Sequence, residues 1–202
     1  KQENCIVTVH LSFACEDFHC LLDEELYLPE SWSNDRARCR EARIPDDMVY
    51  RPKSEIALEQ YDRAVRNGLS FDWLTFDEWY GAKPAFLRAL NKRNQKFVAE
   101  IHKGHMVWMQ KPRVTNRSYR KNRRGISRKT PRLVSGSPKA KAVGELFENS
   151  PKFIKQRWKK WYVKDTQKGP KIIEVKHAIV YPKNDEGLPA QAHHLLVTRD
   201  VQ

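Results

Sequence analysis

Two features of this chain of 202 residues have residue types and spacing that could do chemistry. The first is a single carboxylate, Asp77, which ends the mostly apolar run FDWLTFD at residues 71–77. An aspartate at the carboxyl end of a buried strand lies where open α/β sheets bind their ligands. Its oxygen atoms are also the ligands that Mg²⁺ prefers. The alternative is an ordinary helix N-cap, and the pattern alone leaves both interpretations open.

The second group is a dense run of cations in the middle of the chain. Residues 101–144 hold 13 basic and no acidic side chains, whereas residues 1–100 hold 14 basic and 18 acidic ones. Because the excess is local, it predicts a polyanionic partner, for which nucleic acid is the best candidate. The alternative is a solvated loop without a partner. Eight cations within sixteen residues are the candidate contacts to DNA phosphates: Arg117, Arg120, Lys121, Arg123, Arg124, Arg128, Lys129 and Arg132.

Aromatic residues accompany both groups. Trp158 and Trp161 alternate with lysines, a combination that could stack an extruded base beside phosphates. Ordinary packing within a β-layer is the alternative for both tryptophans. Trp73 and Trp79 flank Asp77, and we expect them to form core or the wall of a pocket.

The cysteines and histidines give no pattern typical of a metal site. No CxxC pair occurs, and no histidine stands at a ligand spacing. We therefore expect buried, reduced thiols in a cytoplasmic protein and a surface position for His193 and His194. No apolar run approaches the roughly 20 residues that cross a bilayer, so a membrane is not an expected partner. The four cysteines are Cys5, Cys15, Cys20 and Cys39.

The order of the predicted elements indicates an α/β first half. Alternating apolar residues predict strands over residues 4–14 and 18–28, and a short helix is expected over 35–43. A helix capped by Ser54 should run to Asn67 with Ile56, Ala57, Tyr61, Ala64 and Val65 as its apolar stripe. Residues 71–76 read as a central strand covered on both faces, followed by a helix over 83–94 and a strand over 97–101.

The second half reads as β-rich. A short helix is expected near residues 140–148, and strands are expected within 153–163, 171–181 and 193–201, separated by turn signals. We therefore place a domain boundary between residues 103 and 104.

Several motifs, taken in their order and spacing, resemble insertion-sequence transposases of the DDE superfamily. These motifs are LYLPESW at 26–32, IPDD at 44–47, KSEIAL at 53–58 and FDWLTFDEWYG at 71–81. In that family, a strand ending in Asp-x-x-Tyr-Gly brings the second catalytic carboxylate, which here matches Asp77, followed by Tyr80 and Gly81. The resemblance implies a partial ribonuclease H-like core over residues 1–103 and a basic, β-rich insertion subdomain over 104–202.

The resemblance also implies a function. An intact enzyme of this type cleaves DNA at the ends of a mobile element and joins them to target DNA, using two Mg²⁺ ions, one of them bound by Asp77. Its partners would be element-end and target DNA and a second copy of itself, in the bacterial cytoplasm at the nucleoid.

The family's first Asp is expected before Lys1 and its Glu after Gln202, so one of three catalytic carboxylates lies in this chain. Because two ions need several carboxylates, we expect these residues alone not to cut DNA. One alternative is a non-catalytic nucleic-acid-binding module that uses the same basic arm. A nuclease with the same core is another, and it would not need the long insertion.

Overall fold

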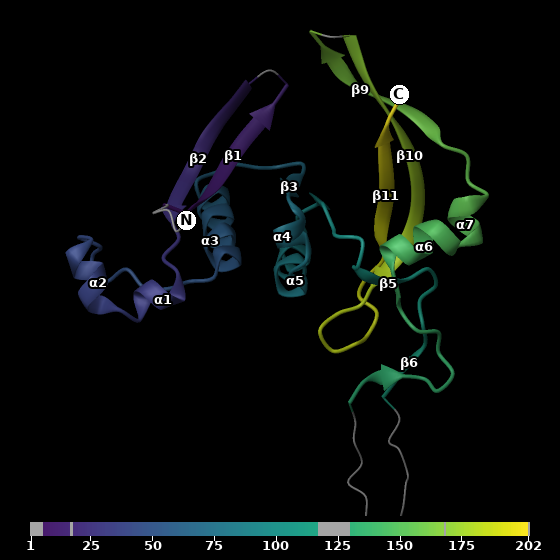
Figure 1. The fold of residues 1–202 in the computed structure, drawn as a ribbon, viewed down its shortest axis with the longest axis horizontal. Helices are drawn as coiled ribbons and strands as arrows, with labels where there is room; N and C mark the ends of the chain where they lie inside the picture. The colour runs from purple at the N-terminus through teal and green to yellow at the C-terminus, as the bar shows by residue number, and fades with distance from the viewer. Residues whose placement is uncertain (1–5, 17, 117–129, 168, 202) are drawn as a thin grey trace, which may run out of the picture. The chain divides into compact units, whose positions relative to one another are not determined.

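Residues 1–100 and 101–202 form two separate units of mixed α/β structure in the computed structural model (Figure 1). The structure describes residues 6–16, 18–116, 130–167 and 169–201. Unit 1 denotes residues 1–100 and unit 2 denotes residues 101–202, and each is described by itself.

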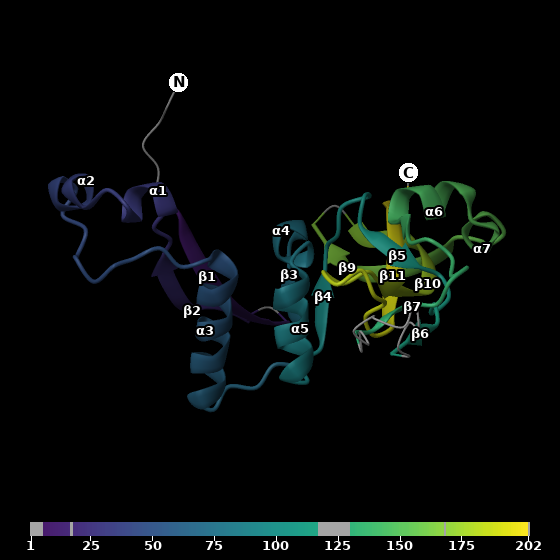
Figure 2. The same cartoon turned by 90° about the horizontal axis from the view of Figure 1, so that it is seen from below.

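Unit 1 begins with an antiparallel hairpin, as the alternating apolar residues predict. Strand β1 (Thr8–Cys15) pairs with β2 (Phe18–Leu26), with a register shift between Leu11 and Ser12. Helix α3 (Lys53–Arg66) packs against both strands (Figures 1 and 2). The Gln60 side chain of α3 is fully buried and donates from Nε2 to the Val9 carbonyl oxygen of β1 at 2.8 Å. This bond ties the helix to the hairpin.

Two expectations for this helix were wrong. The helix begins at Lys53, with Pro52 rather than Ser54 as its N-cap and no side-chain capping bond. The ring of Pro52 holds its φ at −57°, which is compatible with a helix that starts at the next residue, ahead of Ser54. Val65, expected in the apolar stripe, is 42% exposed, and Gln60 is buried there instead. Gln60 can be buried because the Val9 carbonyl oxygen of the hairpin accepts a hydrogen bond from its side chain.

The second part of unit 1 is a strand–helix–strand segment. Strands β3 (Leu74–Phe76) and β4 (Phe97–Ala99) pair in parallel, and α4 (Glu78–Gly81) and α5 (Pro84–Lys92) connect them. The expected central strand over 71–76 is shorter and, within the described residues, pairs only with β4. Phe71 leaves the strand to pack its ring against Tyr61, at 5.9 Å between centroids, and Trp73 is 58% exposed.

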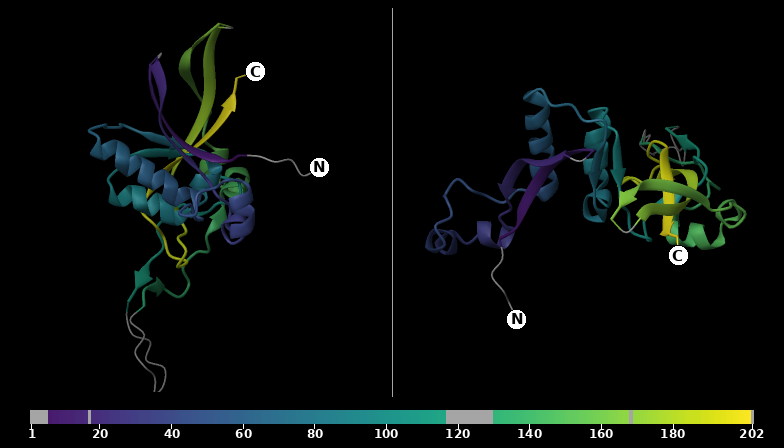
Figure 3. Two further views of the ribbon diagram at one scale, coloured as in Figure 1. Left: turned by 90° about the vertical axis from the view of Figure 1, so that its left-hand side faces the viewer. Right: turned by 90° about the horizontal axis from the view of Figure 1, so that it is seen from above.

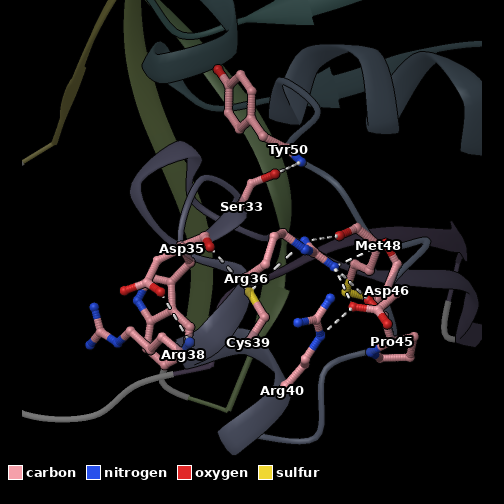
Figure 4. A network of polar contacts seen from close by, with 11 residues as sticks. Ser33, Asp35, Arg36, Arg38, Cys39, Arg40, Pro45, Asp46, Met48 and Tyr50 are labelled. Carbon is pink, nitrogen blue, oxygen red and sulfur yellow. Dashed lines mark hydrogen bonds and ion pairs between the residues drawn. The ribbon is translucent and has the colours of Figure 1, made fainter.

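A small helical segment lies between the hairpin and α3. It contains α1 (Glu30–Ser33) and the expected short helix α2 (Arg36–Glu41). The Arg36 guanidinium donates to the carbonyl oxygens of Asp46 at 2.9 Å and Met48 at 3.0 Å (Figure 4). Cys39 is fully buried beside it and donates from Sγ to the Trp32 carbonyl oxygen at 3.1 Å. One side chain of α2 thus holds the loop that leads to α3.

Unit 2 is built on a five-stranded sheet with the strand order β11–β10–β5–β8, to which β9 is added along β10. Figure 3 shows its long strands in olive to yellow. Helices α6 (Val143–Asn149) and α7 (Pro151–Ile154) cover its core. A separate two-stranded pair joins β6 (Val114–Thr115) to β7 (Arg132–Leu133). The five strands are β5 (Met106–Trp108), β8 (Lys141–Ala142), β9 (Lys159–Thr166), β10 (Gly169–Pro182) and β11 (His193–Asp200).

The predicted strand over 153–163 was wrong at its start. Phe153 and Ile154 belong to α7, where Pro151 opens the helix, and the strand begins at Lys159. Phe153 is fully buried under the sheet with Ala178, Val180 and other apolar residues. In the part of the chain that the structure describes, no helix is long and apolar enough to cross a membrane.

Candidate functional site

Asp77 lies between the end of β3 and the start of α4. Its Oδ1 atom accepts hydrogen bonds from the backbone N–H groups of Trp79 at 3.0 Å and Tyr80 at 3.3 Å. The N-cap interpretation is therefore confirmed. The side chain is exposed, and its Oδ2 atom accepts no hydrogen bond from the described residues. One oxygen thus shapes the turn, and the other is available to a ligand.

A second carboxylate stands beside Asp77. Glu100 directly follows β4, and its backbone N–H donates to the Phe76 carbonyl oxygen at 3.2 Å. Asp77 and Glu100 both line an open depression of about 290 Å³, together with Thr75, Phe76 and Val98. Glu100 is not among the site residues predicted from the sequence. Its place in the sequence was an indication, because Glu100 is the first acidic residue after β4. The parallel pairing of β3 with β4 was needed to place it next to Asp77.

Gly81 ends this turn at a position where only a glycine fits. A Cβ atom at Gly81 would lie 2.0 Å from the Glu100 carbonyl oxygen, so no side chain fits. The preceding residue, Tyr80, packs its ring on Phe86 at 5.3 Å between centroids. Burial raises the pKa of the Tyr80 hydroxyl, and the nearby Asp77 charge adds to this effect. The tyrosine and glycine thus anchor the helix that follows Asp77.

The two tryptophans that flank Asp77 are not core residues, so the first of the two alternatives expected for them is wrong. Trp73 is 58% exposed and Trp79 is 42% exposed. Trp79 holds two ammonium groups over its ring, with centroid distances of 5.7 Å to Lys53 Nζ and 4.8 Å to Lys83 Nζ. An indole ring between cations keeps favourable electrostatic contacts while exposed to water, so its burial is not required.

The predicted DNA-binding cations are described only in part. Arg132 lies in β7, where it pairs with Thr115 of β6. The other seven, Arg117, Arg120, Lys121, Arg123, Arg124, Arg128 and Lys129, lie outside the described residues.

The two candidate stacking residues differ in their surroundings. Trp158 is half-buried, with the Arg199 guanidinium carbon 4.3 Å and Lys176 Nζ 5.0 Å from its ring centroid. Trp161 lies on β9 opposite Ile173 and is 65% exposed. Trp158 is therefore engaged in packing, whereas the ring of Trp161 is accessible.

Other candidate ligands do not gather into a metal centre. Among the described residues, no group of three or more His, Cys, Asp or Glu could hold a metal ion. Cys39 is buried, whereas Cys15 is exposed, which corrects the expectation of buried thiols for that residue. His194 is exposed as predicted, and its Nδ1 atom lies 2.8 Å from Nε2 of His177.

Comparison with known proteins identifies a family. No match was found among curated proteins or among solved structures. The profile of the family described as DDE superfamily endonuclease matches residues 1–170, which is most of the chain. The turn that this match includes contains Asp77, Tyr80 and Gly81 in the arrangement described above. The chain belongs to the DDE superfamily endonuclease family.

Proposed function

We propose that this protein acts in DNA transposition, as an insertion-sequence transposase that cleaves DNA and transfers the cut strand. The observation that carries the proposal is the position of Asp77, at the carboxyl end of β3 and open to the depression that it shares with Glu100. Ligands of α/β sheets bind at such strand ends. Membership of the DDE superfamily endonuclease family supports a nuclease-type reaction on DNA.

The proposed architecture is a ribonuclease H-like core over residues 1–103 with a basic, β-rich insertion over 104–202. An antiparallel hairpin, a covering helix and a parallel strand–helix–strand segment in unit 1 support the first part. The sheet of β9, β10 and β11 supports the second.

In this proposal Asp77 is a catalytic residue that binds Mg²⁺. DDE superfamily endonucleases generally use divalent metal ions, which stabilise the attacking and leaving oxygens of a phosphodiester. The carboxylates of Asp77 and Glu100 are hard oxygen donors of the kind that suit Mg²⁺. They are too few for two ions, and the described residues hold no larger group. We therefore infer that residues 1–202 alone do not cleave DNA and that further carboxylates complete the site.

The DNA contacts in this proposal come from the basic segment and from Trp161. The cations at residues 117–132 bind backbone phosphates of element ends and target, and the exposed Trp161 ring stacks on an extruded base. Trp158, half-buried under two cations, supports this surface. The protein would act as a homodimer at the nucleoid, in the bacterial cytoplasm.

A cleavage assay with the full reading frame of the gene tests the proposal. Asp77→Asn keeps a capping side chain but removes the charge, so we expect cleavage of element-end DNA in Mg²⁺ to be lost while DNA binding is kept. Cleavage that survives Asp77→Asn would refute the assignment.

The second candidate function is a non-catalytic DNA-binding module. The capping bonds of Asp77 favour it, because they give the aspartate a structural reason to be there. This candidate predicts no Mg²⁺-dependent cleavage in the unmodified protein, so the same assay decides between the two.

A further inference from the structure

Two lysines of unit 1 meet at one exposed aromatic ring beside the Asp77 turn. Lys53 Nζ lies 4.8 Å from the ring centroid of Tyr27 and 5.7 Å from the ring centroid of Trp79. Lys83 Nζ lies 4.8 Å from the same Trp79 centroid. Tyr27, Lys53, Trp79 and Lys83 are here called the Trp79 cluster. They come from the segment after β2, from α3, from α4 and from the residue before α5.

The two ammonium groups have no acidic partner in the part of unit 1 that the structure describes. Among the described residues, no carboxylate lies within ion-pair distance of Lys53 or Lys83. Acidic partners are not scarce in this half of the chain, because residues 1–100 hold 18 acidic and 14 basic side chains. Arg63 and Arg93 of the same unit each hold a carboxylate at 2.6 Å. Among the described residues, the two lysines thus have no acidic partner, whereas several arginines of the same unit do.

This arrangement places uncompensated positive charge at a defined spot. Two ammonium groups that share one ring repel each other, and a cation–π contact at an exposed site offsets this by only about 0.5–1 kcal/mol. Both lysines also lie at the start of a helix, where the macrodipole disfavours a cation. An anion bound between them would remove these costs.

The cluster is joined directly to the candidate catalytic residue. The backbone N–H of Trp79 donates to Asp77 Oδ1 at 3.0 Å, so the ring that holds the lysines and the carboxylate belong to one short turn. A DNA strand whose phosphodiester reached Asp77 would bring its neighbouring phosphates to this turn.

We propose that Lys53 and Lys83, positioned by Trp79, bind backbone phosphates of the DNA strand that reaches Asp77. This inference rests on the proposed function for its substrate class and adds a DNA contact in unit 1, apart from the basic segment of unit 2. The lysines act as positioning residues, because they hold the strand and do not touch the reacting atoms.

The test measures the salt dependence of DNA binding by the 202-residue chain. Fluorescence anisotropy with a labelled duplex of mixed sequence is followed over a range of salt concentrations, for the parent and for Lys53→Gln/Lys83→Gln. Each lost phosphate contact should reduce the slope of log K against log[salt] by about 0.9, so we expect a reduction of about 1.8 for the double variant. Lys53→Arg/Lys83→Arg keeps both charges and should keep the parental slope.

Lys96→Gln is the matched control. Lys96 Nζ lies 5.7 Å from the ring centroid of the exposed Trp73, so it repeats the lysine–tryptophan geometry. It precedes β4, at the opposite end of the strand pair from Asp77. We expect Lys96→Gln to leave the slope unchanged. A reduction of about 0.9 in this control, the same per lysine as in the double variant, would overturn the proposal, because the effect would then come from net charge alone.

The remaining outcomes are also decisive. A parental slope in Lys53→Gln/Lys83→Gln, or no DNA binding by the parent chain, would overturn the proposal. If the double variant unfolds, Lys83→Gln alone replaces it, with an expected reduction of about 0.9. A reduced slope in the double variant, together with no Asp77-dependent cleavage by the full reading frame of the gene, would refute the transposase and keep the phosphate contacts. Asp77-dependent cleavage by the full reading frame, together with a parental slope in the double variant, would keep the transposase and refute the phosphate contacts.

Discussion

Asp77 and Glu100 stand at the same edge of the β3–β4 pair. Phe76 pairs with Ala99 in parallel register, and each acid is the next residue along its strand. The two side chains line one depression although 23 positions separate them in the sequence. The close packing of Gly81 against the Glu100 carbonyl oxygen holds the intervening turn in place.

The two roles of Asp77 can be separated by substitution. Asp77→Ala removes the cap of α4 and should reduce the free energy of unfolding of unit 1 by about 1 kcal/mol. Asp77→Asn keeps a capping oxygen and should change it by only a few tenths of that value. Thermal or urea unfolding of the two variants measures the difference. Equal losses in both would show that the charge of Asp77, rather than its hydrogen bonds from Trp79 and Tyr80, stabilises the turn.

Gly81→Ala should destabilise unit 1 by about 2–3 kcal/mol, because its Cβ would lie 2.0 Å from a backbone oxygen and the turn must shift. Gly104→Ala is the control. Its Cβ would meet only ring atoms of His102, at 3.1 and 3.2 Å, and a side chain can rotate away. Urea unfolding compares the two variants. A Gly81→Ala protein as stable as its parent would contradict the close approach of α4 to β4.

The two tryptophans of unit 2 should respond differently to truncation. Trp161→Ala should weaken binding of an oligonucleotide with an unpaired base by about 1–3 kcal/mol, because the exposed ring is available for stacking. Trp158→Ala should instead lower the stability of unit 2 by about 2 kcal/mol, since its half-buried ring packs against Phe147 and Arg199. Anisotropy and urea unfolding on both variants would check this. Unchanged affinity in Trp161→Ala would remove the stacking role.

Acid should destabilise unit 2. Burial lowers the pKa values of His105, His177 and His193 below the ordinary histidine value, and charges of neighbouring groups add to the effect. The unfolded chain then binds more protons than the native one, so stability is complete above about pH 6.5 and falls as the pH drops through the lowered values.

Urea unfolding at pH 7.5 and pH 5.5 measures this change. His105→Gln/His177→Gln should reduce the loss between the two pH values, because two of the responsible groups are gone. His19→Gln is the control, because this histidine lies in the hairpin of unit 1, outside the unit whose unfolding is followed. A midpoint for unit 2 that rises on acidification would contradict the prediction.

Much of the local structure could be predicted from residue patterns. Alternating apolar residues predict the two strands of the hairpin, and the helix expected over 83–94 is observed as α5, with Phe86 and Leu90 buried. The predictions failed where a tertiary contact outweighed the pattern. Phe71 was expected in a strand but packs on Tyr61, and Gln60 is buried because the Val9 carbonyl oxygen accepts its hydrogen bond.

The sequence by itself determined the charge of the basic segment, the order of strands and helices, and the Asp-x-x-Tyr-Gly turn that carries Asp77. These features depend on neighbouring residues, so their pattern is visible along the chain. Only the tertiary structure decided that Glu100 lies beside Asp77 and that Lys53 and Lys83 share the ring of Trp79. Strand pairing and helix packing join residues that are distant in sequence, and no local spacing records which of them will meet.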